Sequence, residues 1–484
     1  MQQRPRPTGR RMTRQQYEAQ QRQNRIAIAI IAAIAVLIIV AVILILKPHG
    51  GGDDAVATMV EAGAGQPAAQ TEAPQTQAPQ SDQPQAGGVD LAAMTGTEPE
   101  NTVQATAAPA EEAPAAAETP VPELPPAVDE VFSTRNPDGG LRSVRMRVIG
   151  DIMFCQSQLV YARDSGYDFH NQFSMIADQL ANADYTMGNM EGTIGKYKSS
   201  NYSGYPQFNA PDVALQPLKD AGIDFLTLAN NHMLDRWSGG VKNTVDWVEQ
   251  YGFAHVGAYR TQAEKDKPVI YEVGGIKFGF VAYTHSTNTM ERRGTDADAV
   301  ALVPYIQKAD FAADVKKLRD AGAEVVIAFP HWGKEYVRTP DDSQKKYAKQ
   351  LAEAGVDIII GSHSHMVQPM GYQTVATANG GSRQVFTMFS MGNFISDHTV
   401  QYTDNGVILD FTVNEHQDGT FTCDSVGYIP TYTWKQNGAV TVLPSGKYLE
   451  KGPAGMTDEA HARLVQTYQE ITEAVGSQFP VLEG

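Results

Sequence analysis

This 484-residue chain has only two cysteines, and its 38 lysines and arginines are outnumbered by 55 acidic residues. Its two cysteines, Cys155 and Cys423, are far apart in the sequence. A disulfide between them is allowed outside the cell, but one distant pair does not imply it, and we expect free thiols. The formal net charge is −17, of which residues 135–484 carry −10. An acidic folded part offers no electrostatic attraction to nucleic acid, which excludes that class of partner.

Lysine and arginine are absent altogether from residues 48–134, a stretch that contains fourteen acids among alanine, proline, glutamine and threonine. Such a composition cannot bury enough apolar surface to order itself, so we predict a disordered stalk over residues 47–140. A flexible coil of this length spans on the order of 50 Å, and more where proline stiffens it. We interpret the stalk as a spacer without a partner of its own.

One long apolar run precedes this stalk. Residues 26–46 are 21 consecutive apolar residues, and a helix of that length spans about 31 Å, the thickness of a bilayer core. Seven arginines and one acid lie in residues 1–25, whereas only Lys47 follows closely. The positive-inside rule therefore predicts a single-pass cell-membrane anchor with a cytoplasmic basic tail and an extracellular domain. A cleaved signal peptide is the alternative, but the run is long for one and no small-x-small cleavage site follows it.

A pattern that occurs three times indicates the fold. A helix-like run ends at Ala-Gly, and an acid, a short apolar strand and a histidine follow. Gly222, Gly322 and Gly355 take the left-handed position that ends a helix. The apolar runs after them resemble strands covered on both faces, at 225–228, 325–329 and 356–360. Because ligands bind beyond the carboxyl ends of strands in open α/β sheets, the histidines that follow should meet at one metal site: His232, His331, His363 and His365.

The remaining patterns predict alternating strands and helices, followed by antiparallel strands. We expect strands at 143–149, 185–190, 384–390 and 406–413, a hairpin of 269–273 and 276–283 around Gly274-Gly275, and helices at 173–181 and 457–475. They predict an α/β fold of mixed sheets between helices in residues 141–415, on which strands and a helix from residues 416–484 pack.

Other ligand-type side chains also follow apolar strands, and each has a simpler interpretation. Asp151 could cap the next helix, Glu191 could be a solvated loop acid, and Asn231 could form an Asx turn. His331 could be an ordinary core histidine. Six oxygen or nitrogen donors at the ends of apolar strands nevertheless favour one shared site. A turn at Ser364 would splay the two histidines that flank it onto two metals.

With these residues in view, the chain resembles a known family. The blocks GDIMF, GNMEG, LANNHMLDRWSGG, HWGKEY, GSHSHMVQP and SMGNF occur in this order between residues 143 and 397. They are similar to those of the CapA (poly-γ-glutamate capsule synthesis) family, a branch of the calcineurin-like metallophosphoesterase superfamily. The resemblance implies a four-layer metallophosphoesterase-like sandwich of two mixed sheets with a two-metal centre.

The resemblance also implies roles for single residues. The metal ligands would be Asp151, Glu191, Asn231, His331, His363 and His365, with Glu191 as the bridge between the ions. His232 would donate a proton to the leaving group. Residues in neighbouring blocks would line the pocket: Asn189, Gln368 and Asn393. Asp235, three residues after His232, is placed to orient its imidazole, although a helix N-cap is an equal alternative.

Two departures from the superfamily bear on activity. The usual Asp-x-His of the first block is Asp151-Ile152-Met153 here, so one metal lacks an imidazole, and Glu191 stands where an aspartate is usual.

Mixed oxygen and imidazole donors suit two Mn, Zn or Fe ions better than Ca. Two divalent cations roughly 3.5–4 Å apart lower the pKa of a shared water and stabilise charge on the entering and leaving oxygens.

Two functions are open. The missing imidazole favours an accessory subunit of a membrane complex that makes or exports a capsule-type anionic polymer such as poly-γ-glutamate, and this is the interpretation we favour. The retained Asn231-His232 pair favours an active metal-dependent phosphoesterase or hydrolase of a cell-surface substrate. An acidic domain that binds an anionic polymer needs metal or local basic residues. Four residues near the site loops could supply this positive charge: Lys196, Lys198, Lys334 and Arg338. For each of them, ordinary surface charge is the simpler interpretation.

Protease added to intact cells tests the predicted topology. A disordered stalk outside the cell is the segment most open to cleavage, so the folded part should be released into the medium. Immunoblots of the medium and of the cell pellet measure this release. A folded part that is cut only after the cells are lysed would contradict the predicted orientation.

Overall fold

Two mixed β-sheets dominate the residues that the computed structural model describes, which are 140–196, 201–292, 300–377 and 380–483. The basic tail, the apolar run at 26–46 and the predicted stalk up to residue 139 lie outside this part of the chain. Within the described ranges, no helix combines the length and the apolar character needed to cross a bilayer.

The first sheet has eight strands. Seven follow the order β16-β15-β14-β1-β2-β5-β6, and the short β13 pairs with the end of β1. Strands β1, β2, β5 and β6 run parallel, whereas β1, β14, β15 and β16 are joined antiparallel. The strands are β1 Ser143–Ile152, β2 Tyr185–Met190, β5 Phe225–Thr227, β6 Ala254–Val256, β13 Asn393–Ile395, β14 Asn405–Glu415, β15 Phe421–Gln436 and β16 Ala439–Pro444.

The second sheet has six strands in the order β11-β12-β10-β9-β8-β7, with a parallel centre and an antiparallel strand at each edge. The edge hairpin of β7 and β8 turns at Gly274 and Gly275, whose φ angles of 56° and 78° match the predicted tight turn. The strands are β7 Val269–Val273, β8 Ile276–Thr284, β9 Val325–His331, β10 Ile358–Ile360, β11 Met370–Ala376 and β12 Ser382–Met388. A separate parallel pair is formed by β3 Thr193–Gly195 and β4 Asn209–Pro211.

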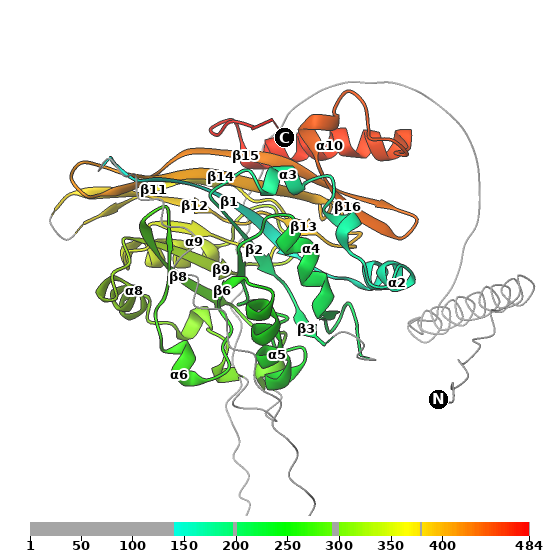
Figure 1. Ribbon diagram of the computed structural model, residues 1–484. Helices are drawn as coiled ribbons and strands as arrows, with labels where there is room; N and C mark the ends of the chain where they lie inside the picture. The colour runs from blue at the N-terminus through cyan, green and yellow to red at the C-terminus, as the bar shows by residue number, and fades with distance from the viewer. Residues whose placement is uncertain (1–139, 197–200, 293–299, 378–379, 484) are drawn as a thin grey trace, which may run out of the picture. The chain divides into compact units, whose positions relative to one another are not determined.

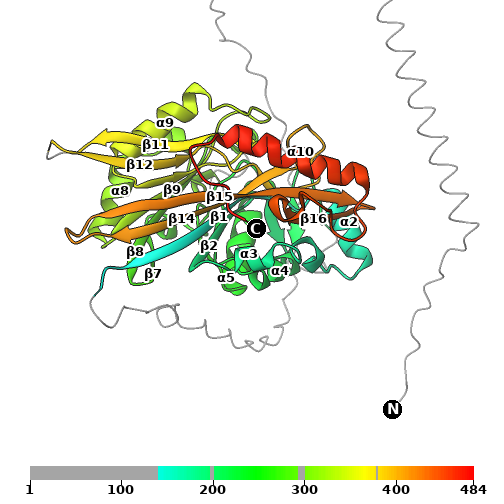
Figure 2. The same ribbon diagram turned by 90° about the horizontal axis from the view of Figure 1, so that it is seen from above.

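Helices cover the outer face of each sheet, and the inner faces pack against each other (Figure 1). Helices α2 Gln156–Asp164, α3 Ala177–Leu180, α4 Leu215–Asp220 and α5 Trp237–Gln250 contribute apolar side chains to the core over the first sheet. Helices α8 Phe311–Asp320 and α9 Asp342–Glu353 do so over the second. The short α6 Gln262–Lys265 follows β6, and α10 Asp458–Val475 packs on β15, as Figure 2 shows from above.

Aromatic rings fill the space between the sheets. Phe225 of the first sheet contacts Phe280 of the second, with ring centroids 4.6 Å apart, and Phe280 stacks on Phe329 at 6.4 Å. All three side chains are buried. Burial of a phenylalanine stabilises a fold by roughly 1.5–3 kcal/mol, so this contact fixes the two sheets together beneath their carboxyl ends.

The α/β class and the mixed sheets predicted from the sequence are confirmed. Gly222, Gly322 and Gly355 have φ angles of 92°, 99° and 106° and follow the last residues of α4, α8 and α9, as helix-ending glycines should. The helix predicted at 173–181 is wrong in extent, because α3 begins only at Ala177 and no side chain caps its first turn. Both cysteines are free thiols.

A buried ion pair joins the first strand to its neighbour. Arg147 of β1 and Asp410 of β14 are 2% and 4% exposed, and the Arg147 Nε lies 2.7 Å from Asp410 Oδ2. Arg145 donates a second hydrogen bond to the same carboxylate, from Nη2 to Oδ2 at 2.7 Å. The alternation of arginine with apolar residues in this strand therefore serves sheet pairing.

Removal of this carboxylate should destabilise the domain. Asp410→Ala leaves the Arg147 charge buried without compensation, and we expect a loss of about 3–5 kcal/mol in the free energy of unfolding, measured by urea denaturation. Asp320→Ala is the matched control, since Asp320 pairs with Lys316 where the two side chains are 63% and 72% exposed. That change should cost less than about 1 kcal/mol. Equal losses in the two variants would contradict the assignment.

Candidate metal centre

The candidate ligands stand where parallel strands of both sheets end. Asp151 lies near the end of β1, Glu191 directly follows β2, and Asn231 lies in the loop after β5. From the second sheet, His331 ends β9, while His363 and His365 follow β10. All of these side chains are less than 4% exposed. The six side chains therefore lie close together at one edge of the two sheets, as predicted.

Two glycines allow the backbone to approach closely around this point. A Cβ atom on Gly150 would lie 2.0 Å from the carbonyl oxygen of Gly392, and one on Gly361 would lie 2.1 Å from that of Phe389. Both glycines directly precede a site segment, since Asp151 follows the first and the His363 turn follows the second. A side chain at either position would push a ligand-bearing strand end out of place.

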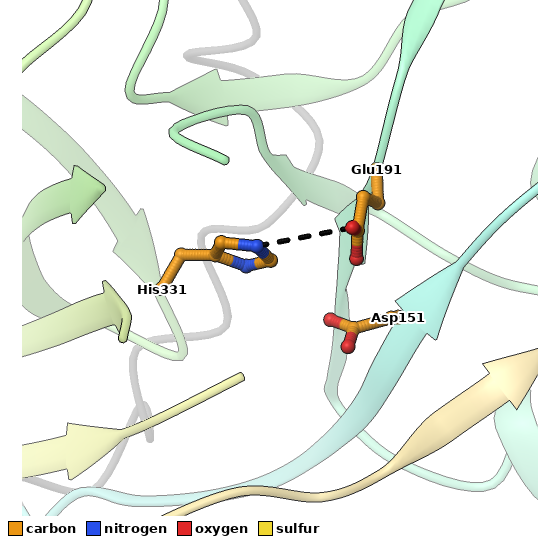
Figure 3. Close-up of side chains that lie close together, drawn as sticks. All are labelled: Asp151, Glu191 and His331. Carbon is orange, nitrogen blue, oxygen red and sulfur yellow. Dashed lines mark ion pairs between the residues drawn. The ribbon is translucent and has the colours of Figure 1, made fainter. Parts of the chain in front are cut away.

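Asp151, Glu191 and His331 form the centre of the site (Figure 3). One ligand atom from each lies within 4.8 Å of those from the other two. The His331 Nε2 is 3.9 Å from Glu191 Oε1. Both Glu191 oxygens are buried and accept no hydrogen bond. A fully buried carboxyl group without donors is costly unless a cation binds there, so this donor set fits a metal ion.

The other donors extend this centre on two sides of Glu191. On one side, His331 Nε2 lies 2.9 Å from Asn231 Oδ1 and 3.1 Å from His363 Nδ1. On the other, His365 Nδ1 lies 3.5 Å from Asp151 Oδ2, and its Nε2 lies 4.0 Å from Glu191 Oε1. The site therefore has two groups of donors, and Glu191 borders both.

The turn that separates His363 from His365 is strained. Their φ angles are 97° and 57°, in the left-handed region that non-glycine residues rarely adopt. Their rings lie 6.1 Å apart, one beside His331 and the other beside Asp151. The two rings are thus splayed onto different donor groups, and their binding to two metals stays a prediction. Strain of this kind is held by its surroundings and is typical of functional sites.

Burial and neighbouring charges shift the pKa values of these groups in opposite directions. Burial, reinforced by the Asp151 charge, raises the pKa of Glu191 well above its usual range. Burial also lowers the pKa values of His331 and His363 well below normal, so both are neutral imidazoles with a free lone pair, as metal ligands must be. Burial opposes protonation of His365, but the Glu191 and Asp151 charges raise its pKa to about 9.

His232 and Asp235 form a buried pair beside these donors. The His232 Nδ1 lies 2.8 Å from Asp235 Oδ2, and the same oxygen accepts a 2.6 Å hydrogen bond from the Phe208 backbone N–H. Arg236, not Asp235, occupies the N-cap position of α5. Asp235 thus holds the imidazole in one orientation, and the role of His232 as a proton donor stays a prediction.

The three predicted pocket residues have different surroundings. Asn189 donates to Asp151 Oδ1 at 2.8 Å, and Asn393 places its Oδ1 2.9 Å from His365 Nδ1, so each contacts a candidate ligand. Gln368 instead binds the Val337 carbonyl and the Gln344 side chain, which braces the loop after β9.

The simpler interpretations of the ligands are mostly ruled out. Asp151 caps no helix, because Cys155 holds the N-cap position of α2. Glu191 is fully buried and cannot be a solvated loop acid.

Of the basic residues considered as polymer contacts, Arg338 stacks on Tyr402 and donates to the Glu470 carbonyl, whereas Lys196 and Lys334 are exposed. Lys198 lies outside the described residues.

Sequence reasoning missed several residues that border the site. His285 follows β8, and its ring centroid lies 4.2 Å from that of His363. His398 lies 4.9 Å from His365, and Tyr336 lies 5.8 Å from it. The Asn288 amide lies 3.3 Å from His232 Nε2. The pattern of an apolar strand followed by histidine was visible at His285, whereas nothing in the sequence around β13 marked His398.

Comparison with known proteins decides the family. A sequence model described as the bacterial capsule synthesis protein PGA_cap matches residues 145–398, just over half of the chain. The chain belongs to this bacterial capsule synthesis protein family. The match begins in β1 and ends at His398, so it contains every candidate ligand and confirms the resemblance to the CapA family.

Two curated relatives are similar over the same region. The chain is 28% identical to the capsule biosynthesis protein CapA of Bacillus anthracis over 290 residues, which cover 58% of this chain and 66% of that protein. It is 26% identical to the PGA biosynthesis protein CapA of Bacillus subtilis (strain 168) over 279 residues, which cover 56% and 68%. The chain thus spans about two thirds of the length of these relatives.

Among solved structures, the calcineurin-like phosphoesterase YfkN from Bacillus subtilis is similar at 15% identity with a TM-score of 0.36. The alignment covers 69% of this chain and 99% of that one. This likeness is weak, and it adds nothing to the family assignment.

Glu191→Gln should remove most of the stabilisation that metal gives. With Mn²⁺ at about 100 times its dissociation constant, the wild-type chain should gain about 2.7 kcal/mol in the free energy of unfolding, because only the folded chain binds. The variant keeps the size of the side chain but loses its charge, so its gain should fall below about 1 kcal/mol. Thermal unfolding with Mn²⁺ and with a chelator measures both gains.

Glu335→Gln is the matched control, since Glu335 is exposed in a loop close to the same ligands. This variant should gain as much from Mn²⁺ as the wild type does. An equal gain in Glu191→Gln and the wild type would show that the buried carboxyl group is not a ligand.

Proposed function

We propose that the chain is an accessory protein in the synthesis or export of a capsule-type anionic polymer such as poly-γ-glutamate. In this proposal it is anchored in the cell membrane by residues 26–46, and its folded domain lies outside the cell with partner subunits of the polymer-making complex. Membership of the capsule synthesis family supports the proposal. The names of the two Bacillus relatives, which refer to capsule and PGA biosynthesis, support it further.

The proposed site holds two divalent ions. Asn231, His331 and His363 would hold one, and Asp151 and His365 the other, with Glu191 between them. Bound divalent cations supply positive charge that attracts anionic groups of the polymer and lower the pKa of a coordinated water. The unpartnered oxygens of Glu191 are the observation that carries this part of the proposal.

The position of the missing imidazole favours binding over turnover. Met153 stands where the superfamily has the histidine of Asp-x-His, and its side chain packs in a small apolar cluster with Cys155 and Phe208. A thioether in such a cluster offers no strong ligand to a hard divalent ion. The Asp151 side of the site therefore has fewer donors than the Asn231 side, which suits a site that binds an anionic group without rapid hydrolysis.

A metal-dependent hydrolase is the second candidate function, and the His232–Asp235 pair favours it. The carboxylate fixes the imidazole through Nδ1, and Nε2, which lies 3.3 Å from the Asn288 amide, is the nitrogen that would release a proton. An imidazole in that state protonates the leaving group of an ester when substrate lies at the neighbouring ligands. The pair lies next to Asn231, so its position fits this role.

Cells whose only copy carries a variant distinguish the two functions. An accessory role with a bound cation predicts that Glu191→Gln lowers cell-surface polymer to the level of a strain without the gene, whereas His232→Ala keeps more than about half. A hydrolytic role predicts equal loss in both, because a general acid contributes about 10²–10⁴-fold to rate. Polymer is measured as hydrolysable glutamate on washed cells. Normal polymer in the Glu191→Gln strain would refute the proposal.

The purified full-length chain tests the hydrolase directly. If it cleaves a phosphodiester whose leaving group is an alkoxide, such as glycerophosphocholine, His232→Ala should lower the rate at least 100-fold. Metal content, measured by elemental analysis, should stay at the wild-type level. Loss of metal in this variant would mean that His232 is a ligand rather than a proton donor.

A further inference from the structure

Tyr336 combines features that its role in the fold does not explain. Its φ angle is 63°, in the left-handed region, where a bulky side chain is a clear outlier. Its side chain is 43% exposed, so burial does not compensate for this strain. Strained residues that persist without a packing reason occur chiefly at binding and catalytic sites.

The surroundings of Tyr336 place it at the edge of the candidate metal centre. Its ring centroid lies 5.8 Å from that of His365 and 6.3 Å from that of His398. Its backbone N–H donates a 2.8 Å hydrogen bond to the Ser364 carbonyl, between the two histidines of the strained turn. The loop after β9 is thereby tied to the ligand turn, and the tyrosine ring is held beside a ligand while still open to solvent.

A glycine three residues before Tyr336 allows the loop to follow this path. Gly333 has a φ angle of 89°, and a Cβ atom there would lie 2.5 Å from the side chain of Gln344. Gln344 in turn binds Gln368, which holds the Val337 carbonyl. The backbone of the loop is therefore fixed on both sides of Tyr336.

We propose that Tyr336 determines specificity at this site by stacking on the planar γ-amide of a poly-γ-glutamate unit whose α-carboxylate enters the metal centre. This inference rests on the proposed function. In such a unit the carboxylate and the amide nitrogen are attached to the same carbon. A carboxylate near His365 therefore brings its amide plane to the ring that lies 5.8 Å away.

The charge of the ring also suits an anionic chain. The phenol of a tyrosine carries no charge at physiological pH. Asp151 and Glu191 repel an anion, as does Glu335, whereas a tyrosine ring carries no net charge. Planar amides and methylene groups pack well on such a face, and the ring can therefore select a polyamide over a free anion.

Binding of a synthetic γ-linked glutamate decamer to the full-length, Mn²⁺-loaded chain tests this role. Calorimetry should show about tenfold weaker binding for Tyr336→Ala and a change of less than about threefold for Tyr336→Phe, because the ring and not the hydroxyl makes the contact. Mn²⁺ content should equal that of the wild type in both variants. Inorganic phosphate, the second probe, should bind all three proteins equally.

Two further variants separate binding from folding. Tyr336→Asn places a residue that tolerates the left-handed conformation at this position, so the melting temperature should not fall although decamer binding weakens. Tyr372→Ala is the control, since Tyr372 is 46% exposed on β11 and packs on Phe386 and Phe479, away from the ligands. It should leave decamer binding unchanged.

The outcomes separate this inference from the proposed function. A wild-type chain that does not bind the decamer would overturn both. If the wild-type chain binds the decamer and Tyr336→Ala binds it equally tightly, only the role of Tyr336 is overturned. Equal weakening of phosphate and decamer binding by Tyr336→Ala would also overturn it, because the ring would then act on the metal centre and not on the amide.

Discussion

Two carboxyl groups buried side by side, those of Asp151 and Glu191, impose the constraint on which the site depends. Like charges in a low-dielectric interior repel strongly unless positive charge balances them. The charges of these two groups raise the pKa of His365 to about 9, and a bound cation would take over this balance and leave the imidazole neutral, as a ligand must be. Glu191 receives no hydrogen bond at either oxygen, so a divalent cation is the partner that best completes the balance.

The division of donors between the sheets explains why the site needs the whole fold. The first sheet contributes the oxygen donors Asp151, Glu191 and Asn231, whereas the second contributes the imidazoles of His331, His363 and His365. Neither sheet alone provides a mixed set of oxygen and nitrogen ligands. The aromatic contacts between the sheets and the close backbone approach at Gly150 and Gly361 therefore support metal binding although they touch no ligand.

Much of this arrangement was predictable from the sequence because continuous apolar runs mark buried parallel strands. The runs before His331 and His363 were recognised in this way, and the rule that ligands gather at carboxyl ends brought these histidines together. Strands were expected after residue 416, but the bounds of the long β15 were not predicted, since its polar and apolar residues alternate irregularly. Tyr336 escaped notice for another reason: its conformation is imposed by contacts with Ser364, and no local sequence signal encodes it.

X-ray absorption at the metal edge of the Mn²⁺- or Zn²⁺-loaded chain tests the central claim most directly, since it reports the atoms around the ion. The account predicts a first shell of mixed imidazole nitrogen and carboxylate oxygen, at about 2.0–2.2 Å for Zn²⁺, and a second ion at about 3.5–4 Å. A shell of oxygen alone, without imidazole scattering, would mean that metal binds elsewhere on the acidic surface and would contradict the account.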